Sequence, residues 1–136
     1  MNLSIANQII NDNYDTCNNS FLDFLHEQDI FNEIKFWELY NAIRFIGELN
    51  KTEPNLDRIL TWRIVKSYEW FLLKLNFHFD ANDGVEIDNL PENFSQFSIR
   101  LREVVGAYIR GSSISDESEY FYNMDLENPL SLKLNN

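Results

Sequence analysis

The sequence predicts an all-α protein, folded as a single-domain bundle of about five helices over residues 1–136. Apolar residues recur at three- and four-residue steps in segments that are long enough for helices. The joints between these segments are short and polar, as helix connections are. The prolines, Pro54, Pro91 and Pro129, fall at segment boundaries rather than inside the apolar patterns.

The first two predicted helices are short. Residues 3–10 carry the first apolar group, and the polar stretch NDNYDTCNN that follows is typical of a loop. Ser20 is a good N-cap for the second helix, and Asp23 stands three residues later, as in a capping box. The apolar face that begins at Phe21 continues to Gln28, where we expect this helix to end.

Two longer helices are predicted over residues 32–49 and 56–77. The apolar positions of the first fall on one helical stripe: Phe36, Leu39, Tyr40, Ile43, Ile46 and Gly47. Those of the second share one face: Leu56, Ile59, Leu60, Ile64, Tyr68, Phe71, Leu72 and Leu75. Trp62, Val65 and Trp70 add apolar surface outside that face, so we expect the second long helix to be central and contacted on several sides.

The C-terminal end of the second long helix has two interpretations. Apolar residues alternate with polar ones from Leu73 to Phe79, and again at Val85 and Ile87 after an Asp-Gly pair. Such alternation is typical of strands, and Asp-Gly favours a tight hairpin turn. A small β-hairpin near residues 73–88 is therefore the alternative to a continuous helix.

The last clear helix lies between Pro91 and Arg110. Its apolar face is formed by Phe94, Phe97, Leu101, Val104, Val105 and Tyr108. Pro91 suits a first helical turn, and Gly111 suits a C-terminal cap. In the acidic tail that follows, we expect one short helix, capped by Ser115 and ended by Pro129.

The chain is strongly acidic, with a formal net charge of −11 from 22 acidic and 11 basic side chains. This charge repels nucleic acid and anionic membranes and favours contact with basic surfaces. Cys17 is the only cysteine, which excludes an intramolecular disulfide and fits a reducing compartment. The N-terminal stretch does not have the pattern of a secretory signal, and no run approaches the ~18 apolar residues of a membrane span. We therefore expect a cytoplasmic protein.

The stretch FDANDGVEIDN, residues 79–89, has the composition of a calcium-binding loop. An EF-hand loop needs a glycine at its sixth position and a glutamate at its twelfth. If Asp80 is the first position, Gly84 falls at the fifth, and if Gly84 is the sixth, the first is Phe79. Because neither register works, we expect an Asp-Gly turn with solvated acids and no metal.

Other metal-binding and catalytic motifs do not occur in the sequence. Asp23 and His26 share a helical face, but a di-metal site of that kind needs a second such pair, and His78 lacks the spacing. Cys17 sits among acids, which oppose formation of a reactive thiolate. There is no G-x-S-x-G elbow, no P-loop and no G-x-G-x-x-G. We therefore expect neither an enzyme nor a bound cofactor.

The acidic tail combines acids with aromatic side chains in the stretch SDESEYFYNMDLE. Charges steer the encounter with a basic partner, and aromatic side chains anchor the contact. The competing interpretation is that the aromatic rings pack on the bundle while the acids are solvated. The candidate partner-binding residues, in the tail and in the 80–88 loop, are Asp116, Glu117, Glu119, Tyr120, Tyr122, Asp125, Asp80, Asp83, Glu86 and Asp88.

With this tail and with FDANDGVEIDN, the chain resembles the small acidic immunity proteins of bacterial toxin–immunity systems, such as those of contact-dependent inhibition. The resemblance implies a binding protein that neutralises a cognate toxin, often a basic nuclease, by covering its active site or substrate surface. The alternative is a phage- or plasmid-borne inhibitor of a host defence protein that mimics nucleic acid. Either partner would be a protein with a basic surface, and the chain itself a monomer or a small homo-oligomer.

Overall fold

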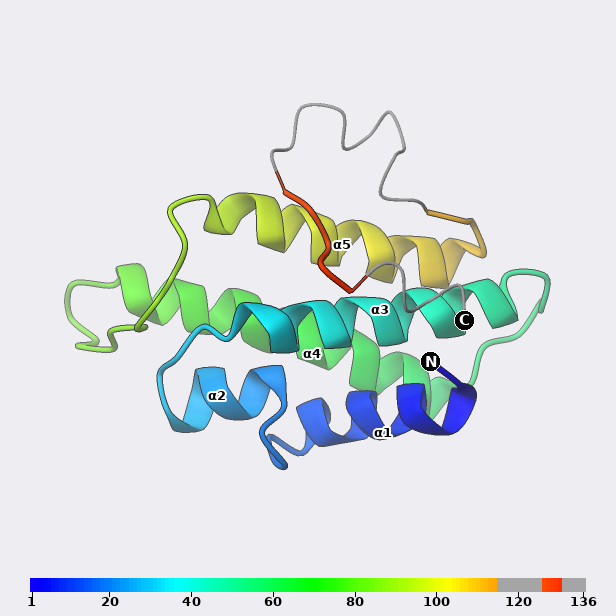
Figure 1. Cartoon of the computed structure of the whole chain (residues 1–136), viewed down its shortest axis with the longest axis horizontal. Helices are drawn as coiled ribbons and strands as arrows, with labels where there is room; N and C mark the ends of the chain where they lie inside the picture. Colours follow the sequence, from blue (N-terminus) through cyan, green and yellow to red (C-terminus); the bar gives the residue numbers. More distant parts are fainter. Residues whose placement is uncertain (115–125, 131–136) are drawn as a thin grey trace.

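Five α-helices follow one another in the computed structural model, which describes residues 1–114 and 126–130. Their bounds are α1 Leu3–Tyr14, α2 Phe21–Glu27, α3 Glu33–Asn50, α4 Arg58–Phe79 and α5 Phe94–Arg110. The described residues hold no strand, only an isolated parallel bridge between Ile30 and Asp88. The predicted all-α class is therefore confirmed. Figure 1 shows α3, α4 and α5 running along the long axis of the molecule, with α1 and α2 beneath them.

Side-chain caps fix the starts of the first four helices. The caps are Asn2, Ser20, Asn32 and Asp57, and each accepts a hydrogen bond from the backbone N–H three residues later. At α2 the predicted capping relation is confirmed, since Ser20 Oγ accepts from the N–H of Asp23 (3.3 Å). Asp23 reaches back in turn, and its Oδ2 accepts from the N–H of Asn19 (2.9 Å).

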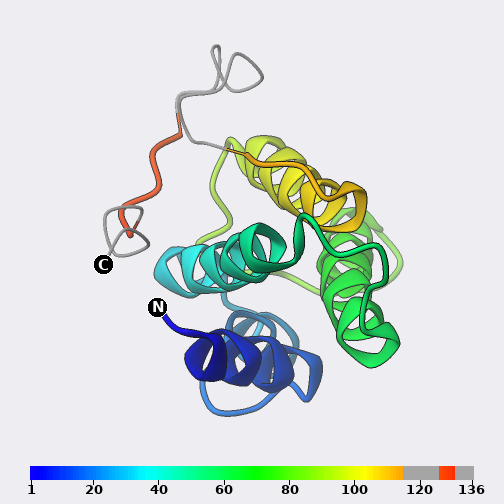
Figure 2. The ribbon, with the colours of Figure 1, turned by 90° about the vertical axis from the view of Figure 1, so that its right-hand side faces the viewer.

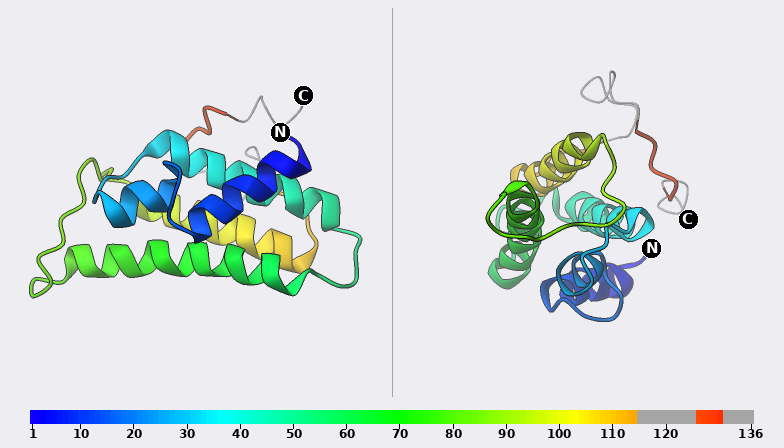
Figure 3. Two further views of the ribbon diagram at one scale, coloured as in Figure 1. Left: turned by 90° about the horizontal axis from the view of Figure 1, so that it is seen from below. Right: turned by 90° about the vertical axis from the view of Figure 1, so that its left-hand side faces the viewer.

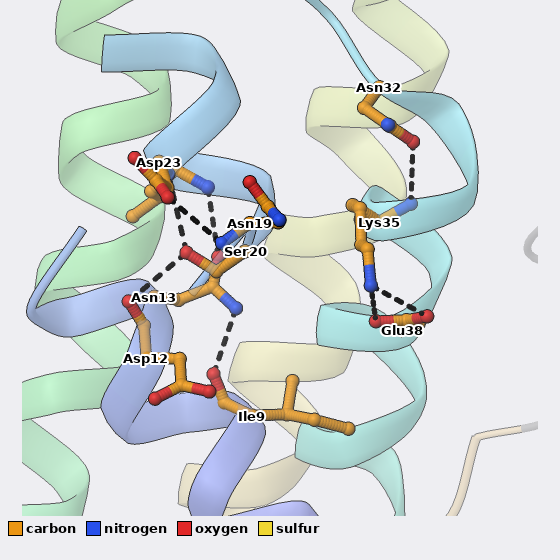
Figure 4. A network of polar contacts seen from close by, with 10 residues as sticks. Ile9, Asp12, Asn13, Asn19, Ser20, Asp23, Asn32, Lys35 and Glu38 are labelled. Carbon is orange, nitrogen blue, oxygen red and sulfur yellow. Dashed lines mark hydrogen bonds and ion pairs between the residues drawn. The ribbon is translucent and has the colours of Figure 1, made fainter. Parts of the chain in front are cut away.

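A buried asparagine, Asn13, joins the end of α1 to the start of α2. Its side-chain nitrogen donates to the carbonyl oxygen of Ile9 (2.9 Å), and its Oδ1 accepts from the N–H of Leu22 (2.9 Å). Ser20 Oγ also donates to the carbonyl oxygen of Asp12 (3.0 Å). Figure 4 shows these contacts gathered in the α1–α2 joint. The NDNYDTCNN stretch, predicted as a loop, is a loop only in part: residues 11–14 form the last turn of α1, and residues 15–19 make the hydrogen-bonded connection to α2.

The helix α5 begins later than the sequence predicts and ends at the predicted residue. The N–H of Phe94 donates to the carbonyl oxygen of Pro91 (3.0 Å), so Pro91 precedes the helix and does not lie in its first turn. Gly111 closes the helix with a left-handed φ of 71°. A Cβ at this position would lie 2.7 Å from the carbonyl oxygen of Lys51, so the close approach of the α3–α4 connection requires glycine.

The central helix of the bundle is α3. Figures 2 and 3 show it between α1 and α5, with α4 at the edge of the molecule. Nine residues of α3 are buried: Phe36, Trp37, Leu39, Tyr40, Asn41, Ala42, Ile43, Ile46 and Gly47. By contrast, α4 buries five residues and leaves Ile59, Trp62 and Leu73 exposed. The prediction that α4 is the central helix is wrong, because α3 holds that place. The predicted contact on several sides is present, since α4 packs against α1, α2 and α5. Trp62 and Trp70 are exposed, whereas Val65 packs against the core.

An aromatic cluster connects four of the helices in the core. Phe21 of α2, Phe36 of α3, Phe71 of α4 and Phe97 of α5 are all buried. Phe21 meets Phe36 and Phe71 edge-to-face with ring centroids 5.5 Å apart in both pairs, and Phe36 meets Phe97 at 5.0 Å. Pairs of this geometry contribute about 0.5–1.5 kcal/mol each beyond the burial of apolar area. These contacts hold the surrounding helices against α3.

The hairpin alternative near residues 73–88 is wrong, because α4 continues to Phe79. Phe71, Lys74 and Leu75 are buried at helical steps, so the helical period persists through the segment that also alternates. At the last turn, the ring of Phe79 lies 5.0 Å from that of Phe94. The connection that follows, residues 80–93, is an irregular loop.

A short described segment, residues 126–130, lies across α5 and α3 (Figure 1). Arg100 Nη1 donates to the carbonyl oxygen of Leu126 (3.3 Å), and Asn128 Nδ2 donates to Asn41 Oδ1 (2.6 Å). Both asparagines are buried, so this hydrogen bond forms in a site of low dielectric. Of the helix predicted between Ser115 and Pro129, residues 115–125 lie outside the described residues, and residues 126–128 are not helical.

Candidate functional site

The loop between α4 and α5 lies at one end of the bundle (Figure 1) and contains four acidic residues. These are the predicted residues Asp80, Asp83, Glu86 and Asp88, and all four are exposed. In the described ranges, no ion pair involves any of them. The loop is therefore a group of uncompensated negative charges that face solvent.

A local turn shapes the first half of the loop. Asp80 Oδ1 accepts from the N–H of Asn82 (2.9 Å), and the carbonyl oxygen of Asp80 accepts from the N–H of Asp83 (3.1 Å). This is the side-chain-mediated turn that aspartate favours. Gly84 follows with a left-handed φ of 75° and open space where a Cβ would stand. The predicted Asp-Gly turn is therefore present, as a loop turn without flanking strands.

The second half of the loop is anchored to the bundle. Ile87 is buried, and its N–H donates to Nδ1 of His78 on α4 (3.0 Å). The N–H of Asp88 donates to the carbonyl oxygen of Asp29 (2.7 Å), and the N–H of Phe31 donates to the carbonyl oxygen of Asp88 (2.9 Å). The loop is thus fixed both to its own helix and to the α2–α3 connection.

Asp29 brings a further carboxylate to the same end of the bundle, which the sequence reasoning missed. It lies in the short α2–α3 connection with a left-handed φ of 54°. Its Oδ1 accepts from Nζ of the buried Lys74 (2.5 Å), while its own side chain is half exposed. No local pattern marks Asp29 as a neighbour of Asp88, because the contact joins segments far apart in the chain.

His26 lies beside this ion pair, between α2 and α4. Its ring meets that of Trp70 edge-to-face at 5.0 Å. Burial lowers the pKa of His26, and the nearby positive charge of Lys74 lowers it further. A backbone hydrogen bond at Trp70 and the carboxylates of Glu27 and Asp29 oppose this shift without reversing it. His26 is therefore biased towards its neutral form.

Residues 1–114 and 126–130 hold neither a metal-binding cluster nor a helix suited to a membrane span. No group of three or more His, Cys, Asp or Glu side chains among them is arranged to hold a metal ion. His78 is already occupied as an acceptor for Ile87. None of the described helices combines the length and the apolar character that crossing a bilayer requires.

The six candidate residues of the tail lie outside the described residues: Asp116, Glu117, Glu119, Tyr120, Tyr122 and Asp125. The described chain before them, residues 111–114, follows the end of α5 that lies opposite the 80–93 loop (Figure 1). After them, Leu126 is held by Arg100. A contribution of the tail to a partner surface stays a prediction.

Comparison of the chain with protein-family models, with curated proteins and with solved structures gave no match.

Proposed function

We propose that this protein binds and neutralises a basic protein partner, as an immunity protein neutralises its toxin. We further propose that residues 80–88, the acidic loop, form part of the contact surface. The observation that carries the proposal is the exposure of Asp80, Asp83, Glu86 and Asp88 without a cationic partner in the described residues. By comparison, Asp23 and Asp57 accept backbone N–H groups at the starts of helices and so serve the fold.

Uncompensated charge favours fast association with an oppositely charged surface. The net charge of −11 supplies a long-range attraction, and the loop concentrates part of that charge at one end of the molecule. Electrostatic steering of this kind raises association rate constants by roughly 10–10³-fold and weakens as salt is added. Fast capture suits an inhibitor that must reach a toxin before the toxin reaches its substrate.

The anchoring of the loop also favours binding. Ordering a flexible loop on association costs free energy, which a loop already held in place avoids. The hydrogen bonds of Ile87 and Asp88 hold the loop backbone against α4 and the α2–α3 connection before any partner arrives. The carboxylates of Glu86 and Asp88 are therefore presented from a fixed main chain.

The chemistry of the partner follows from the charge. A nuclease toxin must present positive charge to phosphate groups, and carboxylates can occupy such a surface in their place. The aromatic side chains Tyr120 and Tyr122 of the predicted tail surface would add anchoring contacts. The proposed partner is thus a toxin domain with a basic active-site or substrate surface.

Affinity capture from the native host, with the tagged full-length chain as bait, tests the proposal. We expect recovery of one protein with a basic surface in a stoichiometric complex, and loss of its toxic or enzymatic activity on binding. A captured protein that keeps its full activity in the complex would rule out neutralisation. Capture that is equally strong for the double variant D83N/E86Q would remove the acidic loop from the contact.

A further inference from the structure

The outer face of α4 presents a stripe of large apolar side chains to solvent. Ile59, Trp62, Trp70 and Leu73 are 65%, 51%, 37% and 47% exposed. With Lys66 between the two tryptophans, these residues recur at three- and four-residue steps and therefore share one side of the helix. Figures 2 and 3 show α4 at the edge of the bundle. Trp70 also packs inward, because its ring lies 5.0 Å from that of His26 on α2. Exposed tryptophan on a soluble protein is typical of contact surfaces.

The stripe is symmetric about Lys66. From Ile59 to Leu73 the steps are three, four, four and three residues, with a tryptophan on each side of the lysine and an aliphatic residue at each end. If two copies of α4 lie antiparallel about a two-fold axis at Lys66, Trp62 of one copy faces Trp70 of the other, and Ile59 faces Leu73. An interface between two identical chains with two-fold symmetry requires this self-complementarity.

The charge at the centre of the stripe is compatible with the same arrangement. Lys66 Nζ lies 3.0 Å from Glu69 Oε2 and 4.9 Å from the ring of Trp62, so the central ammonium group is folded back and neutralised. Arg63 and Glu69 lie about 60° to either side of Lys66, so they stay on opposite flanks of the antiparallel pair and do not meet across it. Arg63 donates to Asn11 and lies over the ring of Tyr14, and no described carboxylate forms an ion pair with it.

We propose that two copies of this chain associate through α4, antiparallel and centred on Lys66. Each α4 leads directly into the acidic loop, so the pairing places the two loops at opposite ends of the dimer. Both loops then remain free to meet a basic partner. The dimer does not depend on the proposed function, because it uses a different face of the molecule.

Two neighbouring leucines of α4 provide a matched test of the face. Leu73 lies on the stripe, whereas Leu72, 38% exposed, is turned away from it by about 100°. We expect sedimentation velocity to show the full-length chain passing from monomer to dimer as its concentration rises. L73E should raise the dimer dissociation constant at least about tenfold, because it buries an unpaired charge at the interface, and L72E should leave it unchanged. Circular dichroism checks that both variants keep their helices.

Cross-linking tests the register. In a C17S background, K66C places the single thiol of each copy at the proposed axis, and L72C places it off the stripe. We expect a short bismaleimide to join two copies of K66C and to leave L72C largely monomeric. The proposal is overturned by a native chain that stays monomeric at every concentration, by equal effects of L73E and L72E, or by preferential cross-linking through L72C.

Discussion

Lys74 Nζ lies 2.5 Å from Asp29 Oδ1, and the lysine is buried while the aspartate is half exposed. The pair joins α4 to the α2–α3 connection. In that connection, the carbonyl oxygen of Asp29 accepts from the N–H of Asp88 and so holds the second half of the acidic loop in place. Asp29 thus connects a buried cation to the loop that we assign to partner binding.

Removing the charge of Asp29 should destabilise the fold more than removing Lys74. Asparagine, like aspartate, tolerates the left-handed backbone at this position, so Asp29→Asn should leave the main chain in place. The substitution leaves the buried ammonium group of Lys74 without a counter-charge. We expect a loss of about 1–3 kcal/mol in the free energy of unfolding, measured by urea denaturation. Lys74→Met keeps the apolar stem packed and leaves only a half-exposed carboxylate, so its loss should be smaller. Equal losses would contradict a dominant role for the buried charge.

His26 should make the protein less stable in mild acid. Because the pKa of His26 in the folded protein lies below its ordinary value of 6.5, the unfolded chain takes up the proton first as the pH falls. The free energy of unfolding should therefore decrease below about pH 6.5, until the folded-state pKa is passed. Urea denaturation of the native chain and of His26→Gln across this pH range checks the sign. A parallel pH dependence in the two proteins would show that His26 does not contribute.

Ile87 should be the side chain that fixes the acidic loop. It is buried and 5% exposed, and Ile87→Ala removes three carbons from that site at a cost of about 2–3 kcal/mol. The effect should be local as well as global, with faster amide hydrogen exchange at Phe31 and Asp88, whose N–H groups form the loop's anchoring bonds. Val85→Ala, at a half-buried position in the same loop, is the control and should leave that exchange nearly unchanged.

Two glycines with left-handed backbones should differ in their tolerance of alanine. Gly84→Ala should cost about 1 kcal/mol, since the φ of 75° is unfavourable for alanine but the surroundings are open. Gly111→Ala should cost more, because its Cβ would meet the carbonyl oxygen of Lys51 as well. Thermal denaturation of both variants measures the difference. A greater loss for Gly84→Ala would contradict the close approach of α5 to the α3–α4 connection.

Local chemistry explains what the sequence predicts well. The helical stripe from Phe36 to Ile46, the N-cap at Ser20 and the C-terminal glycine at Gly111 all depend on residues within a few positions of each other. The structure confirms each of them. The hairpin alternative failed because residues 73–79 satisfy both a two-residue and a helical period, and only the burial of Lys74 and Leu75 in one packed face decides between them.

Long-range packing explains what the sequence predicts poorly. The apolar residues Trp62 and Trp70 led to the prediction that α4 is central, but both are exposed. Hydrophobic periodicity does not distinguish an apolar side chain buried within its own chain from one that is exposed or contacts a second molecule. The contact between Asp29 and Asp88 depends on how the α2–α3 connection folds against the loop that follows α4. Neither relationship has a local counterpart in the sequence.

The rate of association with the captured partner tests the central proposal most directly. The native chain, the loop variant D83N/E86Q and the control variant D15N/E53Q should be compared by stopped flow at several salt concentrations. Both variants remove the same charge from exposed positions, but only the first removes it from the acidic loop. We predict that D83N/E86Q associates several-fold more slowly and with a weaker salt dependence, while D15N/E53Q stays close to the native rate. Equal rates for the two variants at every salt concentration would contradict a role for the acidic loop in binding.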